Sequence, residues 1–208
     1  AGFGWPAEGA YGLATFHLDQ HAGRTFIALA DFFGDSSSIW SNSQPNGSYS
    51  LVQTLPSHAG HSWATMNMGG AEDTITHLFL CNYRTWPASG PCDVDRLTLQ
   101  SSGCPPITPT NSTLWRFDQD RGQFDLVQSL LTHGTNAAEA FVIDGQHYLA
   151  VANAHRNVSD SIAEGVVNST VYRWDTATAQ FMPLQNILTH SALDVKHWKI
   201  GNDDYLGF

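Results

Sequence analysis

The stretch Phe124-Asp-Leu-Val-Gln-Ser-Leu-Leu-Thr-His133 has two close relatives within the same chain. They are Tyr49-Ser-Leu-Val-Gln-Thr-Leu-Pro-Ser-His58 and Phe181-Met-Pro-Leu-Gln-Asn-Ile-Leu-Thr-His190. In every copy a Gln follows the aromatic residue by four positions, and a His follows that Gln by five. Self-similarity of this kind predicts a repeat architecture, in which each copy belongs to one supersecondary unit.

Two further blocks recur in step with this stretch. An aromatic residue lies nine positions before each copy: Trp40, Trp115 and Tyr172. An apolar block that ends in Asp or Asn also recurs: Phe26–Asp31, His77–Asn82 and Tyr148–Asn153. Each block has the length and composition of a β-strand. We therefore expect an all-β protein whose units are four-stranded antiparallel blades of a β-propeller.

The repeats also suggest where the blades begin and end. The expected units are 24–68, 75–143 and 147–200, with 11–18 and 204–208 belonging to flanking blades. Three blades cannot close a ring, since propellers have roughly four to eight. The chain stops within a unit at Phe208, so we expect a fragment of a longer chain, with completion by neighbouring copies as the alternative.

Composition and charge exclude several classes of partner. Charged residues make up 13% of the chain and aromatic residues 12%, and the net charge is −10 with only nine Lys and Arg. A nucleic-acid backbone or an anionic lipid surface needs a basic face, so neither is expected. No apolar run approaches the roughly 20 residues that span a bilayer.

The sequons and cysteines favour an oxidising, extracellular compartment. Four N-x-Ser/Thr sequons occur in stretches that we expect to be loops: Asn46, Asn111, Asn157 and Asn168. A disulfide between Cys92 and Cys104 would close a loop that has no strand pattern. Cys81 stands where the other copies have Ala, which favours a small buried thiol, although its pairing with another Cys stays open.

The ordered blocks resemble a known family. Tyr148-Leu-Ala-Val-Ala-Asn153, Thr170-Val-Tyr-Arg-Trp-Asp175 and Phe181–His190 resemble the EAR repeat, also called the EPTP or epitempin repeat. This family includes the leucine-rich glioma-inactivated proteins and the very large adhesion G-protein-coupled receptor. The resemblance covers the chain from about Tyr11 onward and implies a seven-bladed propeller used outside the cell for adhesion and receptor binding. The first unit departs from the pattern at Ile39–Asn42, so an irregular first blade is expected.

Residues present in every copy are expected to serve the scaffold, because catalysis needs one asymmetric constellation. These are Gln53, His58, Gln128, His133, Gln185 and His190. We expect the Gln amides to bond backbone groups between blades. We expect the Ser/Thr-His pairs to satisfy backbone groups of turns.

A metal site is a second hypothesis for repeated residues. Asp31, Asn82 and Asn153 end the block that we assign to the innermost strand of each blade. Their oxygens would then face a central channel, and oxygen ligands suit Ca²⁺. The resemblance also points to a channel cation. The alternative is that these side chains bond channel water or neighbouring backbone. Asp35 is a secondary candidate, and no other cofactor is expected.

Catalytic residues are not expected. The acidic residues fall mostly in turns, and none joins a Ser/His or Cys/His motif. Beside Asn153, His155 and Arg156 form an unusual polar cluster that we interpret as a solvated loop.

The favoured function is a non-catalytic extracellular module for protein–protein interaction or adhesion. Its partner would be an extracellular protein or receptor ectodomain, bound by the loops 34–38, 84–112 and 155–168, because loops on rigid scaffolds carry recognition. Trp86, Pro105 and Pro106 form the best candidate surface. The alternatives are a structural subunit of an extracellular matrix, coat or filament that contacts neighbouring copies, and a propeller-based carbohydrate-active enzyme.

Overall fold

The computed structural model describes residues 9–18, 24–42, 47–69, 75–83, 110–154 and 166–208. The first sheet contains β1 (Ala10–Phe16), β2 (Phe26–Asp31), β3 (Ser36–Asn42) and β4 (Tyr49–Pro56). The second contains β5 (Gly60–Met68), β6 (Ile75–Asn82), β7 (Thr110–Asp118) and β8 (Gln123–Thr132). The third contains β9 (Thr135–Ile143), β10 (Gln146–Asn153), β11 (Val166–Asp175) and β12 (Gln180–His190). A fourth, two-stranded sheet is formed by β13 (Lys196–Ile200) and β14 (Asp203–Gly207).

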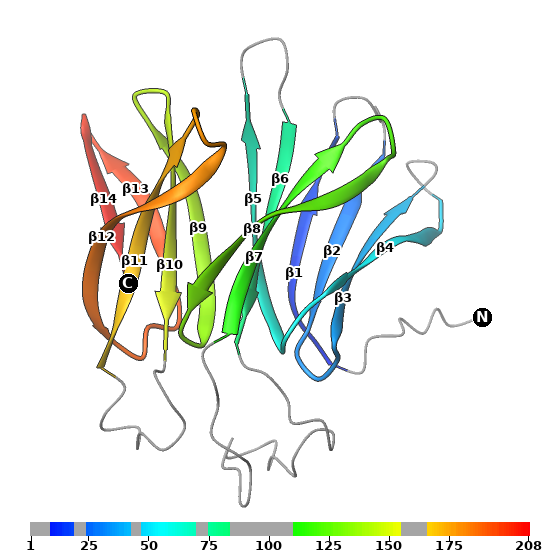
Figure 1. Ribbon diagram of the computed structural model, residues 1–208, viewed down its shortest axis with the longest axis horizontal. Coiled ribbons are helices and arrows are strands. Elements are labelled where there is room, and N and C mark those ends of the chain that lie inside the picture. Colours follow the sequence, from blue (N-terminus) through cyan, green and yellow to red (C-terminus); the bar gives the residue numbers. More distant parts are fainter. Residues whose placement is uncertain (1–8, 19–23, 43–46, 70–74, 84–109, 155–165) are drawn as a thin grey trace, which may run out of the picture.

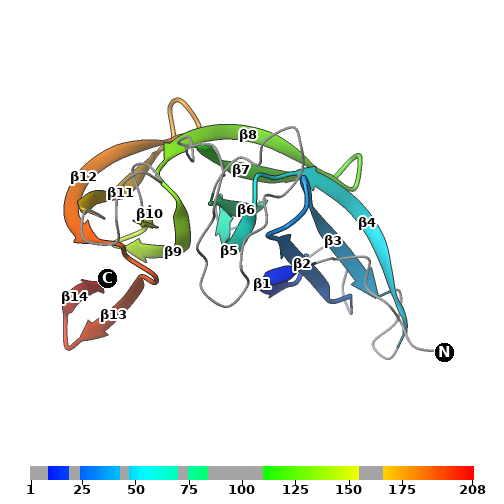
Figure 2. The same cartoon turned by 90° about the horizontal axis from the view of Figure 1, so that it is seen from below.

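The sheets are arranged as blades of a propeller (Figures 1 and 2). Strands follow chain order in each full sheet, and all neighbours are antiparallel. The sheets stand side by side in an open arc, with β1, β5 and β9 on its inner side and β4, β8 and β12 on its outer rim (Figure 2). The architecture is that of a β-propeller fragment with three complete blades and half of a fourth. None of the described residues forms a helix that could span a bilayer.

The blade boundaries expected from the repeats are wrong by one strand. The expected units 24–68, 75–143 and 147–200 each begin at the second strand of a sheet and end with the first strand of the next. Strand 11–18 belongs to the first sheet rather than to a flanking blade, and strand 204–208 pairs with the strand before it. The repeat period defines the order of strands, but hydrogen bonding decides which strands share a sheet. The first sheet is also not irregular, since its strand order matches that of the other two.

The hydrophobic core is divided into layers between successive sheets. β6 shows how one strand serves two layers, because its side chains alternate between its two faces. Leu78 and Leu80 pack in the layer shared with the first sheet, whereas Phe79 and Cys81 pack in the layer shared with the third. A strand covered on both faces needs an almost continuous apolar run, which explains the composition of the repeated block.

The two ends of the sheets carry different connections (Figure 1). At one end, short turns such as 144–145 and 201–202 join neighbouring strands. At the other end, β2, β6 and β10 stop, and the chain crosses from one sheet to the next through corners that begin at Ser57, His133 and Ser191. We call this second end the loop end, because the chain also leaves β6 and β10 there toward residues 84–109 and 155–165.

Candidate functional site

The repeated glutamines join neighbouring sheets through the backbone. Gln53 on β4 donates from Nε2 to the carbonyl of Phe124 at 2.9 Å, and its Oε1 accepts the Phe124 N–H at 2.7 Å. Gln128 on β8 makes the same pair of bonds to Phe181, at 2.9 and 2.8 Å. We call this arrangement the glutamine clasp. Gln185 on β12 occupies the matching position but is exposed.

A β-bulge in each outer strand aims the clasp at the next sheet. The bulged residues are Val52, Val127 and Leu184, each directly before the repeated Gln. A bulge lets consecutive side chains depart from strict alternation. Val52 and Val127 pack against the core layer that their own sheet shares with the next, beside the clasp. The Gln and the apolar residue before it therefore both contact the neighbouring sheet across the same gap between sheets.

Asn82 and Asn153 hold the corners at the loop end. Asn82 Oδ1 accepts the His58 N–H at 3.0 Å, and its Nδ2 donates to the Asn111 carbonyl at 2.7 Å. Asn153 Oδ1 accepts the His133 N–H at 3.1 Å, and its Nδ2 donates to the Asn168 carbonyl at 2.9 Å. Each amide thus ties the corner that enters its sheet to the third strand of that sheet.

Serine and threonine hydroxyls complete each corner. Ser112 Oγ accepts the Asn82 N–H at 3.1 Å and lies 2.8 Å from Thr132 Oγ1, which donates to the Thr110 carbonyl. The third sheet repeats the pattern, and Ser169 accepts the N–H of Asn153. In the first sheet Ser37 Oγ accepts the Asp31 N–H at 3.2 Å.

His58, His133 and His190 lie at matching corners. The backbone N–H groups of His58 and His133 are bonded as described above, and the residue after each His has a left-handed backbone. The φ angles are 48° at Ala59, 59° at Gly134 and 50° at Ser191. Because positive φ angles are uncommon outside glycine, their presence at all three corners indicates that the same turn is repeated in each unit.

The sheet order contradicts the strand position on which the proposed channel metal site depends. Asp31, Asn82 and Asn153 lie on second strands rather than on innermost strands. Asn82 and Asn153 are buried and bonded to main-chain groups, and Asp31 Oδ1 accepts the N–H groups of Phe33 and Gly34. Among the described residues, no three His, Cys, Asp or Glu side chains gather where they could hold a metal ion. The donor set does not fit a Ca²⁺ site, because Asn153 Oδ1 already accepts two hydrogen bonds.

Two of the four sequons lie in strands and not in loops. Asn111 is the second residue of β7, and Asn168 lies at the equivalent place in β11. Both are followed by Ser-Thr, and the Ser is buried in the corner described above. The repeated Asn-Ser-Thr triplet therefore has a structural cause. Its Asn side chain is exposed at position 111 and half-buried at 168.

Cys81 is a free thiol and is completely buried. Burial raises its pKa to about 12, which keeps it protonated. Other residues singled out from the sequence lie outside the described residues: Asn46, Asn157, Cys92, Cys104, Trp86, Pro105, Pro106, His155 and Arg156.

A row of bulged residues on the inner strands was missed from the sequence. Tyr11, His61 and Asn136 occupy the bulges at the starts of β1, β5 and β9. The Tyr11 and His61 rings lie 4.6 Å apart, His61 Nδ1 lies 2.7 Å from the Asn136 carbonyl, and Asn136 Nδ2 donates to the Ala192 carbonyl at 3.0 Å. The row therefore links the first three sheets at the loop end, and it also contacts the corner that leads to the fourth sheet.

Unlike the clasp and the corners, this row differs in chemistry from sheet to sheet. It carries no repeat signal for that reason. The available signal is spacing, because His61 and Asn136 each follow a repeated His by three residues.

An aromatic cluster surrounds the first two members of the row. Phe32 contacts Tyr11, His61 and Tyr83, with ring centroids 5.2, 6.1 and 5.7 Å apart. Tyr11 is 60% exposed. Burial lowers the pKa of His61, so its imidazole is neutral at pH 7. We call Tyr11, Phe32, Phe33, His61 and Tyr83 the loop-end aromatic cluster. Exposed aromatic rings on a rigid support are typical of protein-binding surfaces.

The opposite end of the second and third sheets contains a small cavity of about 210 Å³. Its lining includes Met66, Phe141, His147 and Tyr148. Burial lowers the pKa of His147. Among the described residues that line the cavity none is acidic, so these residues do not supply the carboxylate pair of a glycoside hydrolase.

Comparison with known proteins identifies the repeat. Residues 123–175 match the family model of the EPTP domain, from the start of β8 to the end of β11. This segment also crosses a sheet boundary, as the sequence repeats do. The thrombospondin-type laminin G domain and EAR repeat-containing protein of Homo sapiens is 33% identical over 95 residues, which are 46% of this chain and 14% of that protein. Its Mus musculus counterpart is 32% identical over 95 residues, 46% of this chain and 13% of that protein. The resemblance to the EAR repeat is thereby confirmed.

Solved structures with similar backbones are remote in sequence. An exo-β-1,3-galactanase from Phanerochaete chrysosporium aligns with a TM-score of 0.49 at 8% identity, covering 84% of this chain and 35% of the enzyme. A GH43_1 enzyme from Xanthomonas citri aligns with a TM-score of 0.42 at 11% identity, covering 92% of this chain and 60% of the enzyme.

Proposed function

We propose that this chain, whose repeats are of the EAR (EPTP) type, is a non-catalytic extracellular module that binds another protein through its loop end. The relatives that it matches are named for EAR repeats, and the chain spans only about a seventh of their length. The partner is an extracellular protein or receptor ectodomain.

The observation that carries this proposal is the loop-end aromatic cluster. Its rings come from β1, β5 and the segments after β2 and β6, so two sheets hold it in place. Tyr11 exposes most of its side chain on this support. A tyrosine loses little conformational entropy on binding and offers both an apolar ring and a hydroxyl.

The test measures binding of the chain to extracellular proteins. The protein is secreted from mammalian cells, displayed as a multivalent fusion and screened against a panel of receptor ectodomains. We expect Tyr11→Ser to weaken binding to the ectodomain found by about tenfold or more, as for an interface hot spot. Leu126→Ser is the matched control, because Leu126 is 53% exposed on the outer strand β8, toward the end of the sheet opposite the loop end. Its binding should stay unchanged.

Three results would overturn the proposal. One is an equal loss of binding in the two variants, and another is the absence of any ectodomain that binds. The third is turnover of aryl glycosides by the purified protein.

The extracellular location is tested separately by the mass of the secreted protein. We expect Asn111 to carry an N-glycan, because its side chain is exposed. Treatment with a glycosidase that removes N-glycans should lower the mass of the wild type more than that of Asn111→Gln. Equal mass changes would contradict glycosylation at this site.

A further inference from the structure

Two carboxylates border the rings of the loop-end aromatic cluster. Asp31 ends β2 and Asp35 lies in the connection to β3, with residues 32–34 between them. Asp31 Oδ1 accepts two main-chain N–H groups of that segment, at 3.0 and 3.1 Å. The Asp35 carbonyl accepts the Ser57 N–H at 2.9 Å. Hydrogen bonds therefore hold both ends of the segment that carries two of the rings.

Asp31 also lies beside the rings that come from the inner strands. Its partner in the β1–β2 ladder is Ala10, the residue before Tyr11. On another side, its main-chain N and O would each lie 3.3 Å from a Cβ added to Gly60, the residue before His61. Asp31 and the rings thus belong to one small area at the loop end of the first two sheets.

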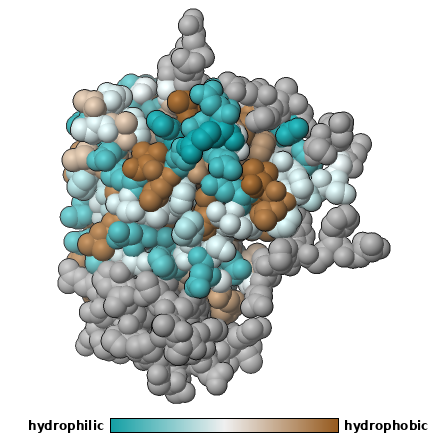
Figure 3. Space-filling model, turned by 45° about the vertical axis from the view of Figure 1, so that its right-hand side comes forward, coloured by the Kyte–Doolittle hydropathy of each residue, from teal (hydrophilic) through white to brown (hydrophobic). Residues whose placement is uncertain are grey.

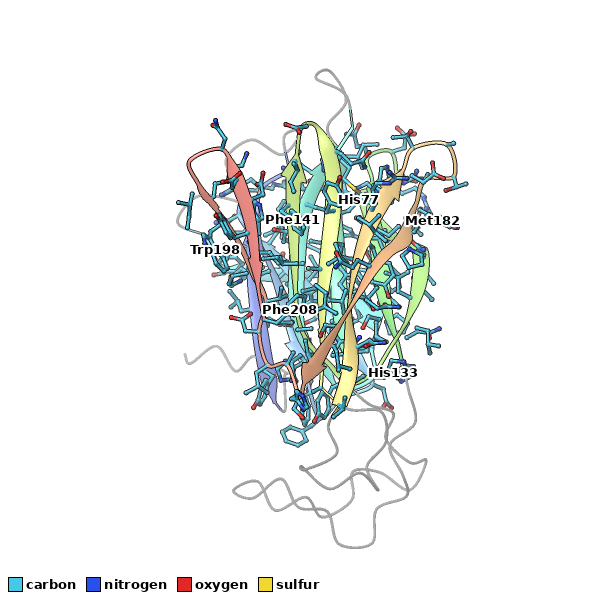
Figure 4. All side chains as sticks on the ribbon, turned by 90° about the vertical axis from the view of Figure 1, so that its left-hand side faces the viewer. His77, His133, Phe141, Met182, Trp198 and Phe208 are labelled. Carbon is cyan, nitrogen blue, oxygen red and sulfur yellow. The ribbon has the colours of Figure 1, made fainter. Side chains whose placement is uncertain are left out.

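Basic side chains of the described residues lie elsewhere. Figure 4 shows the two ends of the molecule, with His133 at the loop end and His77 nearer the opposite end. Lys196 is bonded to Glu139 at 3.1 Å. The other described basic residues lie in or next to the connections at the end opposite the loop end: Arg24, Arg116, Arg121, Arg173 and Lys199.

The charge of the whole chain has the same sign as the loop end. The net charge is −10, and the connections 84–109 and 155–165 contain three Arg against four Asp or Glu. Neither Asp31 nor Asp35 forms an ion pair with a described residue. An acidic surface of this kind attracts a basic partner over a distance and repels an acidic one.

A cation fits this surface better than a neutral anchor does. A partner that covers the rings also removes water from the half-buried carboxylate of Asp31. An uncompensated carboxylate costs more than one aromatic contact returns, whereas a cation offsets that cost and is attracted to the face of a ring. Arginine suits both groups, because its planar guanidinium stacks on aromatic rings and presents paired N–H groups to a carboxylate.

We propose that the loop-end aromatic cluster, together with Asp31 and Asp35, binds an arginine side chain on a basic surface of the partner protein. The guanidinium packs on the ring of Tyr11, which is 60% exposed. Because Asp31 Oδ1 already accepts two hydrogen bonds, the exposed Asp35 is the main acceptor for the guanidinium N–H groups. This inference rests on the proposed function, since it names the chemistry of the partner at the same surface.

The first test compares two blocked peptides, acetyl-Gly-Gly-Arg-Gly-Gly-amide and the same peptide with citrulline in place of arginine. Citrulline has the shape of arginine but carries a neutral urea group. Each peptide is titrated into the full chain, and the NMR signals of the aromatic rings are followed. We expect the arginine peptide to shift the Tyr11 signals and to bind at least about fivefold more tightly than the citrulline peptide. Peptides displayed densely on a sensor surface, with the chain as a multivalent fusion, amplify the same comparison.

Substitutions separate the ring from the carboxylate. Tyr11→Phe keeps an aromatic face and should keep the preference for arginine, whereas Tyr11→Leu should lose it. Asp35→Asn should weaken binding of the arginine peptide by about threefold or more. Asp120→Asn is the matched control, because Asp120 is exposed in the turn after β7 and its variant has the same net charge. It should bind like the wild type.

Equal binding of the two peptides, or binding of neither, would overturn the inference. Equal losses in Asp35→Asn and Asp120→Asn would do the same. The ectodomain found by the binding screen gives a separate measurement, because its affinity should fall with added salt and with Asp35→Asn. An ectodomain that needs Tyr11 but responds to neither change would leave the proposed function standing and would contradict the arginine site.

Discussion

Gln53 and Gln128 hold an aromatic residue of the neighbouring sheet by its backbone. Each supplies one donor and one acceptor to a pair of main-chain groups at the start of an outer strand. Because these groups lie outside the ladder of their own sheet, removing the amide leaves them without a partner. The cost of such a deletion exceeds the value of an ordinary hydrogen bond, since a desolvated polar group stays behind.

We predict different costs for the same substitution at Gln128 and Gln185. Gln128→Ala should lower the free energy of unfolding by roughly 1–3 kcal/mol. Gln185→Ala should change it by less than about 0.5 kcal/mol, because its side chain is exposed. Urea unfolding followed by tryptophan fluorescence measures both. Equal costs would show that the clasp does not stabilise the fold.

Asn153 provides a second prediction, which tests metal binding against a corner role. Asn153→Asp replaces the Nδ2 donor by a carboxylate oxygen that faces the Asn168 carbonyl. We expect a loss of roughly 2–4 kcal/mol in unfolding free energy, as for a buried hydrogen-bonded network. Added CaCl₂ should not restore the melting temperature of the variant, and a chelator should not lower that of the wild type. A Ca²⁺-dependent rise of several degrees would favour the channel metal site.

At the scale of elements, β6 shows how a strand between two sheets tolerates a buried imidazole. His77 is 4% exposed, and its Nδ1–H donates to the Ile75 carbonyl at 3.0 Å. Its ring meets the edge of Trp174 from the third sheet at 5.8 Å. Burial lowers its pKa to about 4, with smaller contributions from the charges of Arg116 and His147. The folded protein therefore keeps this imidazole neutral.

This burial predicts a loss of stability in mild acid. The folded-state pKa lies below the ordinary value of 6.5, so the unfolded chain binds the proton more readily. The contribution of neutral His77 to the free energy of unfolding is fully present above about pH 6.5. It decreases as the pH falls toward 4, by at most about 3 kcal/mol. Urea unfolding between pH 7 and pH 4 should show a shallower pH dependence for His77→Leu than for the wild type. His61 and His147 titrate in the same direction, so a residual slope is expected. Identical slopes would contradict the prediction.

The sequence predicted the strands well and their grouping badly. Repeated blocks located the apolar run of β6 and β10 because burial on two faces leaves a clear composition. The sheet boundary was missed because the chain passes between sheets at a short corner near Ala59, whereas the longer connections 69–74 and 83–109 join strands of the same sheet. Length of connection is therefore a poor guide to sheet boundaries in a chain-ordered antiparallel fold.

The residues of the candidate site were also predicted in part only. Gln and Asn side chains that recur at fixed spacing were assigned backbone partners, although the metal alternative depended on a wrong strand position. Tyr11, His61 and Asn136 differ from one another, so a search for repeats passes over them. Only the bulges, which are a property of pairing register, place them in one row.

At the scale of the whole molecule, the arc has unequal stability along its length. The first three sheets have four strands and share buried layers (Figure 2). The fourth has two strands, and Trp198 and Tyr205 are 43% and 42% exposed on it. Hydrophobic side chains on the surface of the first sheets gather in separate patches between hydrophilic areas (Figure 3). Two-stranded sheets are marginal by themselves.

We predict that the fourth sheet opens first. Native-state hydrogen exchange should show β14 amides exchanging faster than β6 amides by about 100-fold or more, because a locally opened segment costs less than global unfolding. Mass spectrometry after proteolysis resolves the two strands. Equal protection across all four sheets would mean that the chain unfolds as one cooperative unit.

The glutamine clasp hydrogen-bonds to a main-chain N–H and C=O, which almost every amino acid has. It therefore does not depend on which sheet supplies these groups. Tyr49, Phe124 and Phe181 can exchange places without a new complementary surface having to arise. If a gene segment that encodes one sequence repeat were duplicated, the new sheet could form the same clasp with its neighbouring sheets. Growth of such an array by copying is then limited by the curvature of the ring, while the side chains at the inner row are left to diverge.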